Sequence, residues 1–306
     1  MKNSLFLCPM NRQGKVVAIV NRKAGTLSNK GDLLSGLEKH FRQINSSYSD
    51  LEIKNTDGPG HATELARQAA DRGVELCIAI GGDGTVAETA KGLVHTETTL
   101  GIIPIGSGNG LARHIGISMK PINALKQLLF GHSAHMDAGK VNGEYFFLAT
   151  GMGFEGMVAH AFAKQKQRGF FQYLASSTVS WLAYDPIQLT WEMEGELMDE
   201  PVFTWSVANG SQYGNNAQIA PGASVYDGLF NLAWLGPFPL WRGPGLFARL
   251  MQGSLKPSQI YHQNALDSLT VQLQKPQLAH IDGEPAVFED EVKLEIAPHV
   301  LKIIQP

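Results

Sequence analysis

The feature that most constrains the fold is an alternation of short apolar runs with helix-like patterns in the first part of the chain. The runs Lys15–Val20, Leu51–Thr56, Glu75–Ile80 and Thr99–Ile105 have the length and composition of buried strands. Between them, apolar residues recur at spacings of three and four, as on one face of a helix. Two such stripes are Leu34, Leu37, Phe41 and Ile44, and then Ala62, Leu65, Ala66, Ala69 and Ala70. The alternation predicts an α/β domain with a parallel sheet.

The pattern changes after Asp137. The pair Asn142-Gly143 lies between strand-like runs and is typical of a two-residue hairpin loop. Two helices are expected over 155–165 and 170–183, and another between Pro239 and Met251. The remaining segments favour strands, at 187–192, 202–208, 229–235, 269–273, 292–296 and 301–304. The second part is therefore predicted to be a β-rich, largely antiparallel domain.

Charge and composition exclude several classes of protein. Lys and Arg total 25 against 28 Asp and Glu, a formal net charge of −3, which argues against a protein whose main partner is nucleic acid or an anionic membrane surface, although it leaves room for a local basic patch. The only cysteines, Cys8 and Cys77, are too few for a disulfide framework or a cysteine-based zinc site, and they fit a reducing compartment. No apolar run reaches the ~18 residues that indicate a transmembrane segment. We expect a cytoplasmic protein.

The most informative motif is Gly81-Gly82-Asp83-Gly84-Thr85, between a predicted strand and a predicted helix. Glycines let another group approach the backbone, and the free N–H groups of a helix start attract an anion. Phosphate is the natural ligand of such a loop. Asp83 could hold Mg²⁺ or orient a hydroxyl group, although a capped strand-to-helix turn would also explain it.

A second glycine loop, Gly106-Ser107-Gly108-Asn109-Gly110, follows the next strand. The carboxyl ends of neighbouring parallel strands meet at one edge of a sheet, so both loops are expected to face the same ligand. Neither loop has the Gly-Lys-Ser/Thr of a P-loop or the glycine spacing of a dinucleotide fingerprint. Backbone amides are therefore expected to supply most of the phosphate contacts.

Three further segments carry polar residues without a decisive pattern. Asn21–Gly25 follows the first strand, and its Arg22 and Lys23 suit either a phosphate contact or a solvated turn. Asp282-Gly283-Glu284 lies between strands, where the spacing favours a hairpin turn over a general base. Asp227-Gly228 leaves the same choice open.

Taken together, these motifs resemble the diacylglycerol kinase catalytic-domain superfamily, which includes bacterial lipid kinases, ceramide kinases and sphingosine kinases. The motifs occur in the family's order, and the resemblance covers nearly the whole chain from Asn21 onward. It implies an α/β nucleotide-binding domain related to NAD kinase and phosphofructokinase, over residues 1–136 with 298–306 returning to it. It also implies a β-rich lipid-substrate domain over 137–297 and an active site in the cleft between the two domains.

The resemblance also implies roles for individual residues. Glu284 matches the proton acceptor of bacterial relatives, with Asp282 beside it, whereas sphingosine kinases point to Asp83 as the base. Asp227 matches a magnesium site, together with the carbonyl groups of Ser224 and Leu229. The loops and the resemblance together assign nucleotide contacts to Asn21, Arg22, Lys23, Ala24, Gly25, Thr56, Gly81, Gly82, Asp83, Gly84, Thr85, Glu88, Gly106, Ser107, Gly108 and Asn109.

The expected activity is transfer of the γ-phosphate of ATP to a hydroxyl of diacylglycerol or of a related lipid such as a sphingoid base, with Mg²⁺ as cofactor. The lipid would be taken from a membrane surface by peripheral contact. Two alternatives remain open: a kinase of a soluble acceptor such as NAD, and a non-catalytic nucleotide or lipid sensor. The sequence also leaves open whether the chain forms a homodimer.

Overall fold

The computed structural model describes residues 14–24, 35–36, 39, 51–164, 184–193 and 195–306. The chain divides into two compact units, Met1–His135 with Leu301–Pro306, and Met136–Val300. It passes from the first unit to the second within strand β5 (His132–Val141) and returns within β16 (Glu291–Gln305). The helix predicted over 170–183 lies outside the described residues, as does most of the one predicted from 34 to 44.

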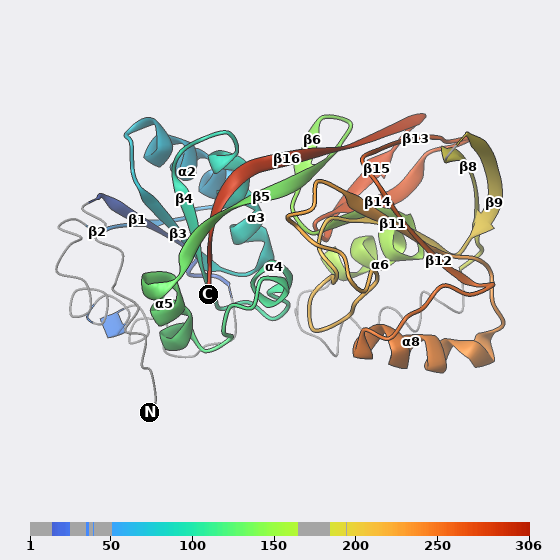
Figure 1. Cartoon of the computed structure of the whole chain (residues 1–306), viewed down its shortest axis with the longest axis horizontal. Helices are drawn as coiled ribbons and strands as arrows, with labels where there is room; N and C mark the ends of the chain where they lie inside the picture. The colour runs from blue at the N-terminus through green and yellow to red at the C-terminus, as the bar shows by residue number, and fades with distance from the viewer. Residues whose placement is uncertain (1–13, 25–34, 37–38, 40–50, 165–183, 194) are drawn as a thin grey trace, which may run out of the picture. The chain divides into compact units, whose positions relative to one another are not determined.

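The first unit contains a parallel sheet (Figure 1). Its strands are ordered β2 (Leu51–Asn55), β1 (Val16–Val20), β3 (Leu76–Gly81), β4 (Thr99–Pro104) and the end of β16, with parallel pairing throughout. All four predicted strands are present, with bounds within one residue of those expected. The predicted α/β character of this part of the chain is confirmed.

Helices cover both faces of this sheet, which explains the nearly continuous apolar runs of its strands. Helix α5 (Pro121–Phe130) buries Leu125, Leu128 and Leu129 against alternate strand residues such as Ile78. The helices α2 (His61–Asp71) and α3 (Asp83–Leu93) pack against each other and against β1, β3 and β4. Figure 1 shows α2 and α5 on opposite sides of the strands.

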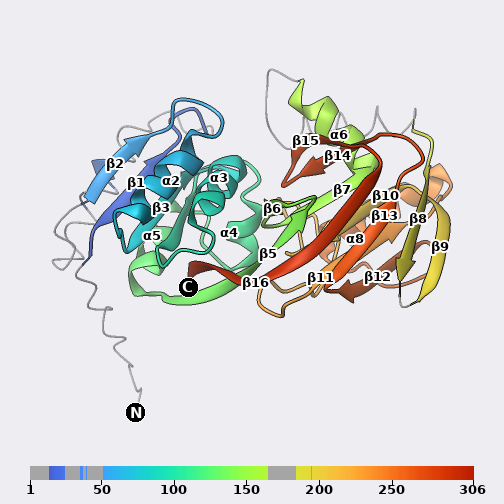
Figure 2. The ribbon, with the colours of Figure 1, turned by 90° about the horizontal axis from the view of Figure 1, so that it is seen from above.

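The second unit contains an antiparallel sheet of six strands. Their order is β12 (Tyr261–Leu266), β11 (Phe230–Leu235), β10 (Thr204–Ala208), β7 (Ala149–Gly153), β14 (Gln277–Ile281) and β15 (Glu284–Phe288). Helix α6 (Phe154–Ala163) follows β7 directly and packs on β14 and β15 (Figure 2). A Cβ on Gly156 would lie 2.0 Å from the Leu278 carbonyl oxygen, so only glycine allows this close approach.

Further antiparallel strands complete this unit. They are β13 (Ser268–Gln272), β8 (Ile187–Met193) and β9 (Glu196–Val202), with β13 also pairing with β16. The buried side chains of Trp191, Trp205 and Trp234 meet edge to face in a core shared by both sets of strands. The predicted β-rich, antiparallel character of the second part is confirmed.

Some local predictions were wrong. The two strands expected at 292–296 and 301–304 are one strand, β16, which continues through Ala297-Pro298-His299 although His299 has a positive φ of 59°. The strand expected over 202–208 begins only at Thr204, since Val202 ends β9. The helix expected between Pro239 and Met251 is a short 3₁₀ turn, η1 (Leu240–Arg242), followed by α8 (Gly243–Gln252). Across the part of the chain that is described, none of the helices combines the length and apolar character that a membrane crossing needs.

Candidate active site

The first glycine loop joins β3 to α3. Gly81 ends the strand, Gly82 caps the helix in an extended conformation, and Asp83 is the first helical residue. The amides of Gly84 and Thr85 belong to the first turn of α3, where N–H groups have no carbonyl one turn earlier to bond to. The geometry is therefore that of an anion-binding helix start.

The second glycine loop is closed by Asn109, which precedes the short helix α4 (Gly110–His114). Asn109 has a positive φ of 53°. Its side-chain Oδ1 accepts the Gly106 N–H at 3.0 Å, and its Nδ2 donates to the Gly106 carbonyl at 2.8 Å. The Arg113 Nε donates to the Gly108 carbonyl at 2.9 Å. These contacts fix the loop before any ligand binds.

Asp83 joins the two loops. Its Oδ2 accepts the Asn109 N–H at 2.8 Å and its Oδ1 accepts the Gly110 N–H at 2.6 Å. A Cβ on Gly106 would lie 2.5 Å from the Gly82 Cα, so the loops also touch through their backbones. Burial raises the pKa of Asp83, and the two amide bonds partly oppose that rise. Donors that the sequence assigned to phosphate, at Asn109 and Gly110, are thus bonded to Asp83.

The turn after β1 contacts the first glycine loop. The Asn21 Nδ2 donates to the Thr85 Oγ1 at 3.1 Å, while the Asn21 Oδ1 accepts the Lys23 N–H at 2.9 Å. Arg22 points elsewhere, with its Nε 2.8 Å from the Asn55 Oδ1. Ala24 completes the turn by donating its N–H to the Asn21 carbonyl. Gly25 lies outside the described residues.

Two other predicted nucleotide contacts also lie in the first unit. Thr56 follows β2 and donates its N–H to the Val20 carbonyl, which places it at the same edge of the sheet. Glu88 faces the start of α2, where its carboxylate accepts the N–H groups of Gly60 at 2.9 Å and Ala62 at 3.2 Å. The structure thus gathers Asn21, Thr56, Thr85 and both glycine loops at one edge, and gives the Glu88 carboxylate a helix-capping contact.

In the second unit, Asp282 and Gly283 form the two-residue loop between β14 and β15. Their φ values of 49° and 83° are those of a type I′ turn, and Ile281 pairs with Glu284 across it. The hairpin turn favoured by the sequence spacing is therefore present. The same turn geometry recurs at Asn142 and Gly143, between β5 and β6 (Glu144–Phe146), as the Asn-Gly pair predicts.

Both oxygens of the Asp282 carboxylate accept backbone amides. Its Oδ2 accepts the Phe147 N–H at 2.8 Å, and its Oδ1 accepts the N–H groups of Leu148 at 2.8 Å and Ala149 at 3.2 Å. The Asp282 N–H in turn donates to the Ala149 carbonyl at 2.9 Å. Asp282 therefore binds the hairpin turn to the segment that leads into β7.

Glu284 differs from Asp282 in its surroundings. It is exposed at the first position of β15, directly after the turn. Among the described residues, its carboxylate has no hydrogen bond or ion pair. Glu284 is thus a free carboxylate on a backbone that Asp282 holds in place.

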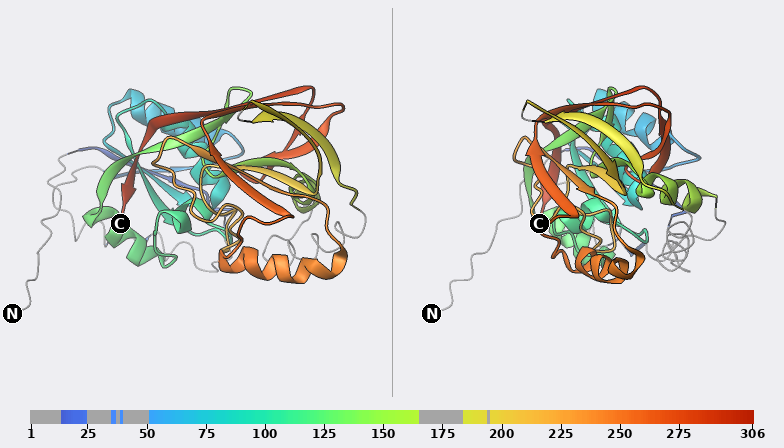
Figure 3. Two further views of the ribbon diagram at one scale, coloured as in Figure 1. Left: turned by 45° about the vertical axis from the view of Figure 1, so that its right-hand side comes forward. Right: turned by 90° about the vertical axis from the view of Figure 1, so that its right-hand side faces the viewer.

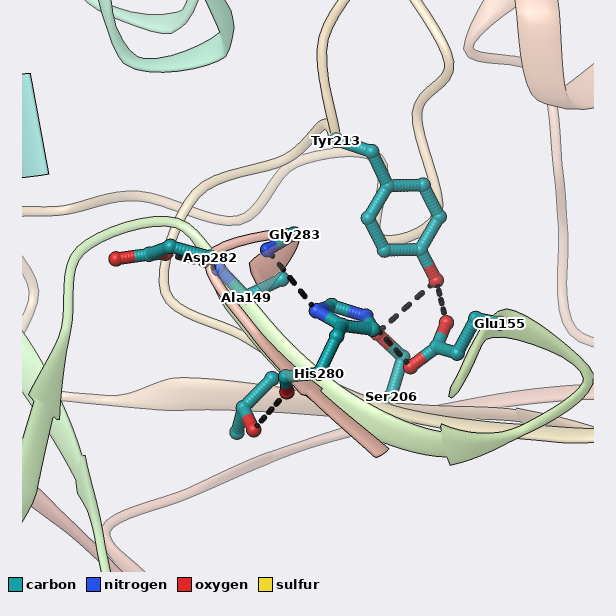
Figure 4. Close-up of polar contacts among 8 residues, drawn as sticks. Ala149, Glu155, Ser206, Tyr213, His280, Asp282 and Gly283 are labelled. Atoms are coloured by element: carbon teal, nitrogen blue, oxygen red, sulfur yellow. Dashed lines mark hydrogen bonds and ion pairs between the residues drawn. The ribbon is translucent and has the colours of Figure 1, made fainter. Parts of the chain in front are cut away.

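A buried polar network lies behind this turn (Figure 4). The His280 Nδ1 accepts the Gly283 N–H at 3.2 Å, which puts the proton of the neutral ring on Nε2. That Nε2 lies 3.3 Å from the Glu155 Oε1, and the other Glu155 oxygen accepts the Tyr213 hydroxyl. Glu155 is only 8% exposed. A Cβ on Gly151 would lie 1.5 Å from Glu155 Oε1, so the absence of a side chain there makes room for the carboxylate.

Neither Glu155 nor His280 was among the residues that the sequence assigned to the site. Each has an ordinary local context, and the two are brought together only because β14 pairs with β7, placing His280 opposite Gly151. No spacing signal could have identified this pair, since the residues lie far apart in the chain.

The predicted magnesium ligands lie in a turn of the second unit. The Asp227 Oδ1 accepts the Leu229 N–H at 3.1 Å, and the turn is anchored by the fully buried Asp137, whose Oδ2 accepts the Gly228 N–H at 2.7 Å. The carbonyls of Ser224 and Leu229 accept no loop hydrogen bond from any described residue. One free carboxylate oxygen and two carbonyls are oxygen donors of the kind Mg²⁺ takes. Within the described ranges, no three acidic, histidine or cysteine side chains form a metal cluster.

Comparison with known proteins identifies the family. The diacylglycerol kinase catalytic domain matches residues 15–141, and the YegS C-terminal NAD kinase beta sandwich-like domain matches residues 149–305. The chain belongs to the diacylglycerol kinase family of lipid kinases. The predicted family is confirmed.

Individual relatives in this family agree with that assignment. A probable lipid kinase YegS-like protein of Chromohalobacter salexigens is 25% identical over 286 residues, covering 92% of each chain. The diacylglycerol kinase of Bacillus subtilis is 28% identical over 260 residues, covering 81% of this chain and 84% of the relative. A solved structure named as a putative diacylglycerol kinase from Bacillus anthracis superposes with a TM-score of 0.78 at 24% identity, covering 96% and 97% of the two chains. Membership in this kinase family implies ATP and a lipid as substrates.

Proposed function

We propose that the chain transfers the γ-phosphate of ATP to a hydroxyl group of diacylglycerol or a related lipid alcohol, such as a sphingoid base, with Glu284 as the general base. The observation that carries this proposal is the exposed carboxylate of Glu284, which no described residue bonds, close in the chain to the Asp282 carboxylate, which accepts three backbone amides. A general base needs an unoccupied lone pair within reach of the proton it takes.

The carboxylates of the two other candidate bases already accept hydrogen bonds from backbone amides. Both oxygens of Asp83 accept N–H groups at 2.8 Å or less, and so do both oxygens of Asp282, with a third amide at 3.2 Å. These amides stabilise the charged form of each carboxylate and hold it in place, whereas the Glu284 carboxylate accepts no hydrogen bond from a described residue. This favours positioning roles for Asp83 and Asp282.

The reaction then needs two contributions from the chain. The first-turn amides of α3 at Gly84 and Thr85, with Lys23, Ser107 and the backbone of both glycine loops, would hold the phosphates of ATP. The Glu284 carboxylate would take the proton of the lipid hydroxyl as its oxygen bonds to the γ-phosphorus. The bond from the γ-phosphorus to the bridging oxygen breaks, and ADP leaves.

We also propose Mg²⁺ at two places. Bound with ATP, it would supply charge neutralisation on the phosphates. At the turn of the second unit, Asp227 with the carbonyls of Ser224 and Leu229 would hold it and stabilise that turn.

The experiment is incubation of the full chain with γ-labelled ATP, Mg²⁺ and three separate acceptors: diacylglycerol, a sphingoid base and NAD. Label in a lipid phosphate, absent in Glu284→Gln, is the expected result, and it names the lipid. Label in NAD alone would replace the proposal with a soluble-acceptor kinase. ATP binding with no labelled product in any arm would favour the sensor.

A further inference from the structure

One surface of the second unit combines exposed apolar side chains with positive charge. It consists of Leu240, Trp241, Arg242, Phe247 and Arg249, and we refer to it as the α8 surface. Leu240 is 55% exposed and Trp241 is 74% exposed, in a protein whose Trp191, Trp205 and Trp234 are fully buried or nearly so. Large apolar side chains this exposed and this close in sequence indicate an interaction site.

Helix α8 is fastened to the unit by its inner face only. Leu246 and Leu250 pack against the cluster of buried residues that includes Ile219 and Tyr261. The Leu250 carbonyl accepts the Gln218 N–H at 2.9 Å. Phe247, at 39% exposure, and Arg249 lie outside these contacts. Figure 3 shows α8 in orange along one side of the unit, with no other described element on its outer side.

The charge of this region is one-sided. From Gly228 to Leu266 the chain contains no Asp or Glu, while Arg242, Arg249 and Lys256 are cationic. The whole chain has a net charge of −3, so the positive charge here is local. The Arg242 guanidinium lies 5.1 Å from the centre of the Trp241 ring. A tryptophan held beside an arginine is suited to the boundary between lipid head groups and acyl chains.

We propose that the α8 surface docks on an anionic phospholipid bilayer, with Leu240, Trp241 and Phe247 entering the interface and Arg242 and Arg249 contacting the head groups. The choice of a bilayer as the partner rests on the proposed lipid kinase function, since a lipid acceptor resides there. The charge argument selects anionic lipid over a zwitterionic surface. The single tryptophan and two further apolar side chains give shallow, reversible attachment.

The test is co-sedimentation of the full chain with vesicles of phosphatidylglycerol and phosphatidylcholine, compared with vesicles of phosphatidylcholine alone. We expect binding to the anionic vesicles that weakens with added salt. Trp241→Ala should reduce the partition coefficient at least about tenfold, since it removes the largest apolar side chain of the α8 surface. Arg242→Gln with Arg249→Gln should reduce it more than tenfold, from about fivefold for each cation near an anionic surface.

Two matched controls come from the same unit. Leu197 is 73% exposed, as much as Trp241, but lies among Glu196, Asp199 and Glu200, so Leu197→Ala should leave vesicle binding unchanged. Lys275→Gln, which removes an exposed cation from the turn before β14, is the control for the two arginine substitutions and should leave vesicle binding unchanged. If Trp241→Ala binds anionic vesicles as wild type does, or if both vesicles bind equally, the proposal is wrong.

A further measurement separates this proposal from the proposed function. Kinase activity is assayed on a short-chain, water-soluble diacylglycerol, for which the α8 variants should match wild type. A wild-type chain that binds vesicles through the α8 surface but phosphorylates no lipid would leave the docking surface standing and remove the kinase assignment. If Trp241→Ala instead converts a dimer to a monomer in sedimentation velocity, the surface is a contact between copies and the proposal is overturned.

Discussion

Asp83 in the first unit and Asp282 in the second unit make the same kind of contact. Each stands beside a glycine at the end of a buried strand, and each uses both carboxylate oxygens to bind backbone amides from a distant segment. They differ in what stands next to them. Asp83 opens a helix whose first amides are left for an anion, whereas Asp282 lies two residues before a free carboxylate. The comparison shows that an aspartate in a glycine motif can hold two distant backbone segments together through both of its carboxylate oxygens.

The largest effect is expected at Glu284. Glu284→Gln keeps the size of the side chain but removes the proton acceptor, so kcat should fall by about 10²–10⁴. The melting temperature should stay within error of wild type, because no described residue bonds to this carboxylate. Glu289→Gln, at the other end of the same hairpin strand, is the control. Full activity of Glu284→Gln together with an inactive, folded Asp83→Asn would transfer the base to Asp83.

The next effect is on stability, at Asp282. Asp282→Ala leaves three amides without their acceptor and places alanine at a positive φ, so the free energy of unfolding should fall by about 3–5 kcal/mol. Urea unfolding followed by tryptophan fluorescence reports on this unit, because Trp191, Trp205 and Trp234 are buried in it. Asp282→Asn retains one acceptor oxygen and tolerates the turn, and should lose less.

Asn142 provides the internal control for that measurement. It has the same φ of 49° in a type I′ turn, and its Oδ1 accepts one amide, from Lys293, at 2.7 Å. Asn142→Ala should therefore cost only about 1–2 kcal/mol. Equal losses in Asn142→Ala and Asp282→Ala would mean that turn strain, and not the three amide bonds, sets the stability of both hairpins.

A smaller effect on catalysis is expected at His280. His280→Ala frees the Gly283 N–H and leaves the buried Glu155 without its neighbour, so the turn carrying Glu284 should lose definition. We expect kcat to fall about tenfold with KM for ATP unchanged, since small displacements of a reacting group are costly. His280→Asn can restore an acceptor for Gly283 and should recover part of the rate. His262→Ala, which removes a ring stacked on Trp234, serves as control. An unchanged kcat in His280→Ala would show that Asp282 alone holds the turn.

How much of this could be read from the sequence differs between the two units. In the first, buried strands and helix stripes have strong local periods, and the strand bounds were predicted almost to the residue. In the second, β7 reads Ala-Thr-Gly-Met-Gly, and its small residues give no strand signal; it is a strand because β10 and β14 pair with it on either side. Likewise, 292–296 and 301–304 were predicted as two strands, although β16 continues through Ala297-Pro298-His299.

The candidate site, too, could be predicted from the sequence only in part. The glycine loops and the Asp282-Gly283-Glu284 turn were found from local sequence, because glycine and aspartate at strand ends are local signals. What each carboxylate bonds to was not predictable, since the partners of Asp282 are amides more than a hundred residues earlier in the chain. The Glu155–His280 contact likewise depends on strand register, which the sequence does not state.

The smallest expected effect is a pH dependence of stability caused by Asp83. Burial raises the pKa of Asp83, so the folded state holds this proton more tightly than the unfolded state does. The resulting stabilisation is complete below the unfolded pKa of about 3.9 and is lost as the pH rises through the folded pKa. The stability of wild type relative to Asp83→Asn should therefore decline as the pH increases above about 4. Urea titrations at several pH values measure the difference, and Asp71→Asn, an exposed carboxylate on α2, accounts for the loss of one negative charge. If the stability of wild type relative to Asp83→Asn instead increases with pH, the expectation is wrong. The hydrogen bonds from the Asn109 and Gly110 amides would then stabilise the charged carboxylate by more than burial destabilises it.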